Sequence, residues 1–132
     1  MAAIKGRSRE LLEKPNFANV GVNRPDGSPH VVPVWVDVED GVVTLNSAEG
    51  RVWPRLARED PRITITVQNH ESPYEYVTIH GHVEDATHEG ADEHIDALAQ
   101  KYLGEETYPF RQPGEQRIKF RITPDRVQHH GQ

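Results

Sequence analysis

The sequence of 132 residues contains no cysteine, which excludes disulfide bonds, thiolate nucleophiles and cysteine-ligated zinc or iron–sulfur centres. It also lacks any apolar run near the roughly 20 residues that a membrane-spanning helix needs. The first residues lack the apolar segment of a signal peptide. We therefore expect a cytoplasmic protein that does not enter a membrane and forms a single domain over residues 1–132.

Positive charge is also scarce. The chain has 15 Lys and Arg residues against 21 Asp and Glu residues, for a net charge of −6, which argues against general nucleic-acid binding because that depends on many cationic contacts to phosphates. From residue 25 to residue 100 the only cations are Arg51, Arg55, Arg58 and Arg62. Their spacing of four, three and four residues places them near one face of a helix. The cluster is a candidate seat for an anionic group, and a solvated helix face is the simpler alternative.

The hydrophobic pattern predicts a chain of strands interrupted by helices. Residues 62–68 alternate strictly, with Ile63, Ile65 and Val67 on one side. Valine at every second position predicts a strand over 30–38 with a core face, in which Pro33 indicates a bulge or an edge position. Further strands are expected over 17–23, 42 to 45 or 47, 74–85 with a bend at Gly81, and 117–122 before a polar tail. Helices are expected over 4–14, over a segment with Pro54 in its first turn that Asp60–Pro61 ends, and from Thr87 to Leu103 with Gly104 as the stop.

These elements define a fold class. Strands joined by tight turns form antiparallel sheets, and strands of this number on a small chain tend to close into a barrel, which removes exposed edges. We therefore expect a mostly β fold, an antiparallel β-barrel of six or seven strands with flanking helices.

Two stretches of the sequence are similar to a known family. The run PDGSPHVVPVWVDVEDGVVTLNS and the following AEGRVWPRLAREDPRITITV resemble the flavin/deazaflavin split β-barrel superfamily, often called pyridoxamine 5′-phosphate oxidase-like. The later run DATHEGADEHIDALAQKYLGEETYPFRQPGEQRIKFRITPDRV resembles its branch of coenzyme F420-dependent oxidoreductases. The resemblance implies a split-barrel homodimer with two cofactor sites at the subunit interface. It further implies hydride transfer from reduced coenzyme F420 to an activated double bond of a small organic substrate.

The resemblance also assigns residues to the cofactor phosphate. Carried onto this sequence, the loop and helix after the third strand supply Ser47, Arg51 and Arg55, with Val52 and Trp53 between them. Arg58 and Arg62 are expected to support the fold instead. Family members often have Lys where this chain has Trp53. The resemblance therefore implies that the indole packs against the cofactor or the adjacent loop.

Other candidate residues would surround the cofactor ring. On the second strand, a flat pocket is expected from side chains that leave the core face and from the main chain between them: His30, Val31, Val32, Pro33 and Trp35. For Trp35, a position in the core or in a dimer interface is an equally good interpretation. The resemblance places Tyr74 and Tyr76 near the neighbouring subunit's site, and Tyr108 is a further candidate for the substrate side.

Several alternatives stay open at this point. The same fold could use FMN as an oxidase or reductase, or bind a flavin or haem without catalysis, and an interaction module is a third class. His80 and His82 share a strand face but lack a third ligand, so we expect surface or interface histidines and no metal site. The side chains alone indicate no reaction, no catalytic residue and no proton donor, which is typical of enzymes whose chemistry a cofactor carries.

Overall fold

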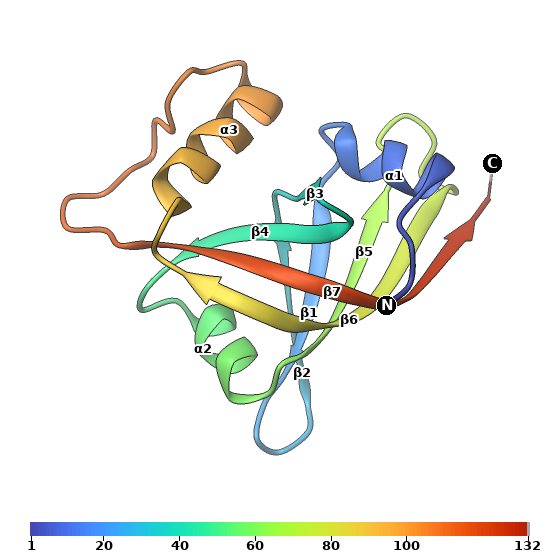
Figure 1. Ribbon diagram of the computed structural model, residues 1–132, viewed down its shortest axis with the longest axis horizontal. Coiled ribbons are helices and arrows are strands. Elements are labelled where there is room, and N and C mark those ends of the chain that lie inside the picture. The colour runs from blue at the N-terminus through green and yellow to red at the C-terminus, as the bar shows by residue number, and fades with distance from the viewer. Residues whose placement is uncertain (132) are drawn as a thin grey trace.

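The computed structural model describes residues 1–131, which form one seven-stranded antiparallel sheet and three helices. The strands are β1 (Ala18–Asn23), β2 (Pro29–Val34), β3 (Asp37–Glu39), β4 (Val42–Ala48), β5 (Arg62–Gln68), β6 (Tyr76–Thr87) and β7 (Arg117–His130). The helices are α1 (Gly6–Glu13), α2 (Val52–Glu59) and α3 (Ala91–Leu103). The strand order β2-β1-β5-β6-β7-β4-β3 wraps around one core, as Figure 1 shows. The expected antiparallel split β-barrel with flanking helices is confirmed.

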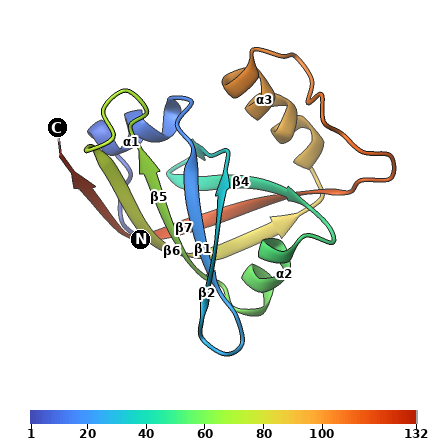
Figure 2. The same cartoon turned by 180° about the vertical axis from the view of Figure 1, so that it is seen from behind.

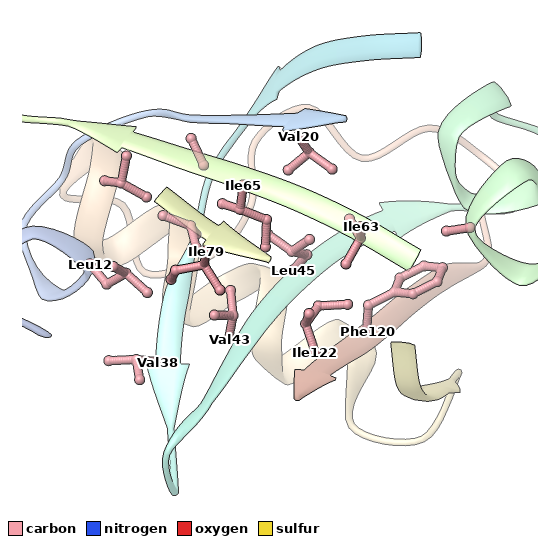
Figure 3. Packing of buried hydrophobic residues seen from close by; sticks show 14 of the residues in the cluster. Leu12, Val20, Val38, Val43, Leu45, Ile63, Ile65, Ile79, Phe120 and Ile122 are labelled. Carbon is pink, nitrogen blue, oxygen red and sulfur yellow. The ribbon is translucent and has the colours of Figure 1, made fainter. Parts of the chain in front are cut away.

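The core fills the barrel because every strand turns its apolar side inward. In β5, Ile63, Ile65 and Val67 are buried between exposed or half-buried polar residues, as the period of two requires. Leu45 of β4 and Phe120 of β7 are paired neighbours and are fully buried (Figure 3). Of the helices, α1 and α2 cover opposite ends of the barrel (Figure 2). None of the helices formed by residues 1–131 is long and apolar enough to cross a membrane.

β4 is buried along its whole length, and this positions the site described below. Its residues 43, 45 and 47 face the barrel interior, whereas residues 44, 46 and 48 lie on the opposite face of the sheet. α3 lies against β4 and β7 and covers this second face. α3 and the connection from 104 to 116 project to one side of the barrel in Figure 1.

The predicted strand over 30–38 is broken in two, so that part of the prediction was wrong. β2 ends at Val34 and β3 begins at Asp37. The N–H of Val36 donates to the hydroxyl of Tyr102 (3.0 Å), and its carbonyl accepts from Lys101 Nζ (2.6 Å). Because these backbone groups bond to α3, they leave the strand ladder. The break is therefore fixed by α3 and carries Trp35 at its centre.

Two other boundaries differ from the expectation. β7 continues to His130 and pairs with β6 from Lys119 onward, so the predicted polar tail is a strand end. In it, His129 Nε2 lies 2.8 Å from a carboxylate oxygen of Glu75. α3 begins at Ala91 after a left-handed Gly90 (φ 75°), and Thr87 instead accepts a hydrogen bond from the N–H of Glu89 (3.1 Å). The predicted bend at Gly81 is confirmed by a register shift between residues 80 and 81, and the stop at Gly104 by its left-handed φ of 71°.

Candidate functional site

A cavity of about 250 Å³ lies beside α3. It is bounded by α3, the 104–116 connection, the break between β2 and β3, β4 and the start of β7. Its mouth is formed by the exposed Phe17, Pro33, Arg51 and Phe110, its walls by Val34, Trp35 and Tyr108, and its floor by the buried Asn46, Ile95, Leu98 and Arg117. The cavity is thus largely apolar with a few polar groups, as small-molecule sites usually are.

The aromatic wall is held rigidly. The Trp35 indole stacks on Tyr102, with ring centroids 5.1 Å apart and planes 9° apart, and meets the Tyr108 ring edge-on at 6.0 Å. The Tyr102 hydroxyl donates to the carbonyl oxygen of Asn16 (2.6 Å) and accepts from Val36 (3.0 Å). Burial raises the pKa of Tyr102, so this phenol stays neutral and keeps its donor. Trp35 therefore offers a fixed flat surface to a planar ligand.

The floor contains one polar network. Arg117 is 4% exposed; its Nε donates to Asn46 Oδ1 (2.9 Å) and its Nη1 donates to Glu115 Oε1 (3.0 Å). The Asn46 amide nitrogen donates to the carbonyl oxygen of Ala91 (2.9 Å) and lies 3.0 Å from His94 Nδ1. Asn46 thereby joins β4, α3 and β7 beneath the cavity.

The start of α2 forms a second, cationic surface next to the cavity. Arg51 and Arg55 line a depression of about 350 Å³ beside Pro54, whose lining also includes Arg58, Glu49 and Glu59. No side chain caps this helix, so the N–H groups of Val52 and Trp53 are free to bind an anion. Within residues 1–131, Arg55 makes no ion pair, and the only one of Arg51 is a 3.8 Å contact to Glu115.

The other two arginines of the cluster are neutralised by the fold. Arg58 donates from both Nη atoms to Glu49 (2.8 and 2.9 Å), and together with His88 it holds the pKa of Glu49 down to about 2. Arg62 donates from Nη2 to Asp60 (2.7 Å). These contacts agree with the prediction that Arg58 and Arg62 support the fold and leave Arg51 and Arg55 available.

Comparison with known proteins identifies the family. The family model described as pyridoxamine 5′-phosphate oxidase matches residues 4–131. The chain belongs to the pyridoxamine 5′-phosphate oxidase family. A search among curated proteins finds no match. The cavity and the surface at the start of α2 therefore lie on the split barrel of this family.

Solved structures share the fold of this family member at low sequence identity. An F420 reductase superposes with a TM-score of 0.82 at 22% identity, covering 95% of this chain and 98% of its own. A conserved hypothetical protein from Mycobacterium tuberculosis gives a TM-score of 0.73 at 18% identity, covering 97% and 86%. An FAD-binding protein from Mesorhizobium loti gives 0.68 at 20% identity, covering 91% and 88%. At these identities the likeness establishes the fold, and function has to be argued from the site.

The side chains of Ser47 and Trp53, which were expected near the cofactor phosphate, are directed into the protein interior. The hydroxyl of Ser47 is fully buried and has no hydrogen-bond partner among residues 1–131. Ser47 shares the interior face of β4 with Leu45, whereas its neighbour Asn46 faces the cavity. The indole of Trp53 is 4% exposed and packs on Phe120 at 4.8 Å. The side chain of Trp53 therefore belongs to the core. Of its two expected partners, the cofactor and the adjacent loop, the burial speaks against the cofactor.

The remaining predicted residues divide by position. Pro33, Trp35, Arg51 and Tyr108 line the cavity. Three predicted residues of β2 lie outside it: His30 is 3.3 Å from Arg24 at the β1–β2 hairpin, Val31 is exposed, and the half-buried Val32 packs against the core. Tyr76 at the start of β6 and Tyr74 just before it are exposed and also lie outside the cavity. His82 pairs with Asp125, and no group of three metal-ligating side chains occurs in residues 1–131.

The sequence interpretation missed the cavity floor and half of its mouth. Asn46 and Arg117 carry its polarity, and Phe17 and Phe110 border its entrance. The one available signal was weak, because Asn46 is only one of three polar residues in this strand, beside Thr44 and Ser47. Arg117 gave none, because an arginine that begins a strand is usually solvated.

The buried His94 makes stability depend on pH. Burial and the nearby charge of Lys119 lower the pKa of His94 from 6.5 to about 4. The unfolded chain therefore binds a proton below pH 6.5 that the folded chain refuses until pH 4, so the stability is present at neutral pH and is lost as pH falls. We expect this residue to remove about 2 kcal/mol of unfolding free energy between pH 7 and pH 5. Urea denaturation at both pH values should show a smaller pH dependence for His94→Gln than for the wild-type protein; equal slopes would contradict a neutral His94.

Proposed function

We propose that this protein is a deazaflavin-dependent oxidoreductase that binds coenzyme F420 with its phosphate at the start of α2 and its ring across the mouth of the cavity. One observation carries the proposal: Arg51 borders both the aromatic cavity and the cationic depression at α2. A ligand with a planar ring joined by a short chain to a phosphate would contact both surfaces at once.

The donor set fits such a phosphate. Arg guanidinium groups bind phosphate oxygens in a bidentate manner, and an uncapped helix N-terminus adds main-chain donors. Arg51 and Arg55 supply the first, and the N–H groups of Val52 and Trp53 supply the second. Pro33 and Trp35 would flank the ring at the mouth.

The cofactor, when bound, supplies a hydride, which is two electrons and one proton, to the electron-poor carbon of an activated double bond. The second proton comes from solvent, and we assign no side chain as its donor. The protein residues orient the ring and exclude water from the cavity through the wall of Trp35 and Tyr108. We further propose a homodimer in which the exposed Tyr74 and Tyr76 complete the neighbouring subunit's site.

A flavin-dependent reaction of the same fold is the second candidate. It is supported by the family match and by the FAD-binding structural neighbour. The two candidates differ in which reduced cofactor is reoxidised. We expect the purified protein to oxidise reduced F420 in the presence of a panel of enones, quinones and tetrapyrroles. Turnover with reduced FMN alone would favour the second candidate, and tight cofactor binding without any turnover would favour a non-catalytic carrier.

A further inference from the structure

The guanidinium of Arg117 is the one charged group in the cavity floor that the proposed cofactor site does not use. An arginine has five N–H groups, and Arg117 employs its Nε towards Asn46 and its Nη1 towards Glu115. Its Nη2 makes no hydrogen bond to any residue between 1 and 131. Although only 4% of Arg117 is exposed, Nη2 is not one of the fully buried polar atoms without a partner, so this donor keeps some access to solvent. The cavity that Arg117 lines would supply that partner when a ligand enters.

The charges around the floor favour an anionic partner. The Glu115 side chain, 7% exposed, accepts from Arg117 at 3.0 Å and lies 3.8 Å from Arg51. Two guanidinium groups thus share one carboxylate, so Arg51, Arg117 and Glu115 together carry one excess positive charge in the protein without cofactor. The proposed cofactor phosphate would balance Arg51, and Arg117 would still offer its Nη2 to a carboxylate or another oxyanion. Charges in such sparsely solvated surroundings interact more strongly than at the surface.

The surrounding side chains restrict the shape of that anion. The guanidinium carbon of Arg117 lies 5.0 Å from the centre of the Tyr108 ring, and Trp35 meets the same ring at 6.0 Å. Ile95 and Leu98 of α3 complete an apolar floor. These groups pack well on a flat conjugated molecule and poorly on a hydrated, flexible acid. A volume of about 250 Å³ holds one small acceptor behind the cofactor ring.

We propose that Arg117 anchors the acceptor substrate and that this substrate is a small planar conjugated carboxylate. Asn46 and Glu115 are positioning residues that hold the guanidinium through Nε and Nη1 and leave Nη2 available to the ligand. The identification of this ligand as an acceptor rests on the proposed function. The anion site itself rests only on the geometry of the floor.

The test compares trans-cinnamate with its neutral analogue cinnamamide, by calorimetric titration of the protein with and without cofactor. We expect cinnamate to bind about 10-fold more tightly or better, as is usual for a charge-assisted hydrogen bond. Arg117→Met should remove this preference and Arg117→Lys should retain part of it. The control is Arg126→Met, because Arg126 lies on the same strand, is exposed and makes no ion pair within residues 1–131; it should leave the preference unchanged.

The possible results separate the two proposals. Equal binding of the two probes, no binding of either, or a preference that survives Arg117→Met would overturn the anchor. If Arg117→Met does not fold, the wild-type comparison and Arg117→Lys still decide it: a preference in the wild type that Arg117→Lys weakens upholds the anchor, and an unaltered one refutes it. Titration of the same samples with F420 and FMN tests the proposed function. A preference for cinnamate without binding of either cofactor would refute the proposed function and uphold the Arg117 anchor. Cofactor binding without a preference for cinnamate would refute the anchor and leave the proposed function intact.

Discussion

Replacing Trp53 with alanine is expected to lower the free energy of unfolding by about 3–5 kcal/mol, the usual loss for a large aromatic side chain removed from a core. The indole is 4% exposed and its ring centre lies 4.8 Å from that of Phe120, which is fully buried. Phe120 in turn receives the guanidinium of Arg58 at 6.0 Å. The cavity left by the substitution would open between α2 and β7. Urea denaturation followed by far-ultraviolet circular dichroism measures the loss.

The conservative variant Trp53→Phe separates stability from binding. It keeps an aromatic ring against Phe120 and should retain most of the stability, because cores tolerate swaps that preserve most of the volume. Its affinity for the cofactor should equal that of the wild type, since the indole does not border the cavity. A small stability loss in Trp53→Ala, combined with weaker cofactor binding in Trp53→Phe, would contradict the core position and indicate that the indole contacts the cofactor.

Arg51→Ala is expected to weaken cofactor binding by about 1.5–3 kcal/mol, or about 10- to 150-fold in Kd. Arg51 borders both surfaces of the proposed site, and its only ion pair within residues 1–131 is the 3.8 Å contact with Glu115. The guanidinium is therefore available to an incoming phosphate. The stability should change little, because Arg51 is half-exposed, its contact with Glu115 is long, and Glu115 keeps its shorter ion pair with Arg117 at 3.0 Å. Equilibrium titration with F420 and with FMN measures the effect.

Arg62→Ala is the matched control for this substitution. Arg62 comes from the same group of four cations, but it is bonded to Asp60 and lies outside both surfaces. Its removal should leave cofactor affinity unchanged. Equal losses of cofactor affinity in Arg51→Ala and Arg62→Ala would indicate a diffuse electrostatic effect of the whole cluster. An unchanged affinity in Arg51→Ala would mean that Arg51 lies on a solvated helix face and does not bind the cofactor.

The barrel could be predicted from the local sequence pattern because the alternation of apolar and polar residues shows which face of each strand is buried. The alternation of Ile63, Ile65 and Val67 fixes β5, and the turn residues between strands fix antiparallel pairing. The strand pattern depends on neighbours within a few residues of chain. The division of the four arginines followed from the family resemblance, because proximity in the sequence does not give it: Glu49 is closer in the chain to Arg51 than to Arg58, the residue it pairs with.

The orientation of single residues in the site depended on contacts that no local pattern contains. Ser47 was expected at the site, but its neighbour Asn46 faces the cavity instead, because adjacent strand residues face opposite sides of the sheet. Which of the two sides holds the ligand depends on where α3 packs. The break at Trp35 exists because Lys101 and Tyr102, more than sixty positions away, bond to Val36. The cavity floor likewise requires β7 to lie beside β4.

The proposal that the cavity at Trp35 and the cations at α2 form one cofactor site is tested most directly in Trp53→Phe protein. The chain has two tryptophans, so this variant leaves Trp35 as the only indole, and its fluorescence reports on the cavity alone. Titration with F420 should quench Trp35 until one cofactor is bound per chain, and adding Arg51→Ala should move the midpoint to higher concentration without changing the final quenching. Unquenched Trp35 fluorescence at saturating F420 and at saturating FMN would contradict the site.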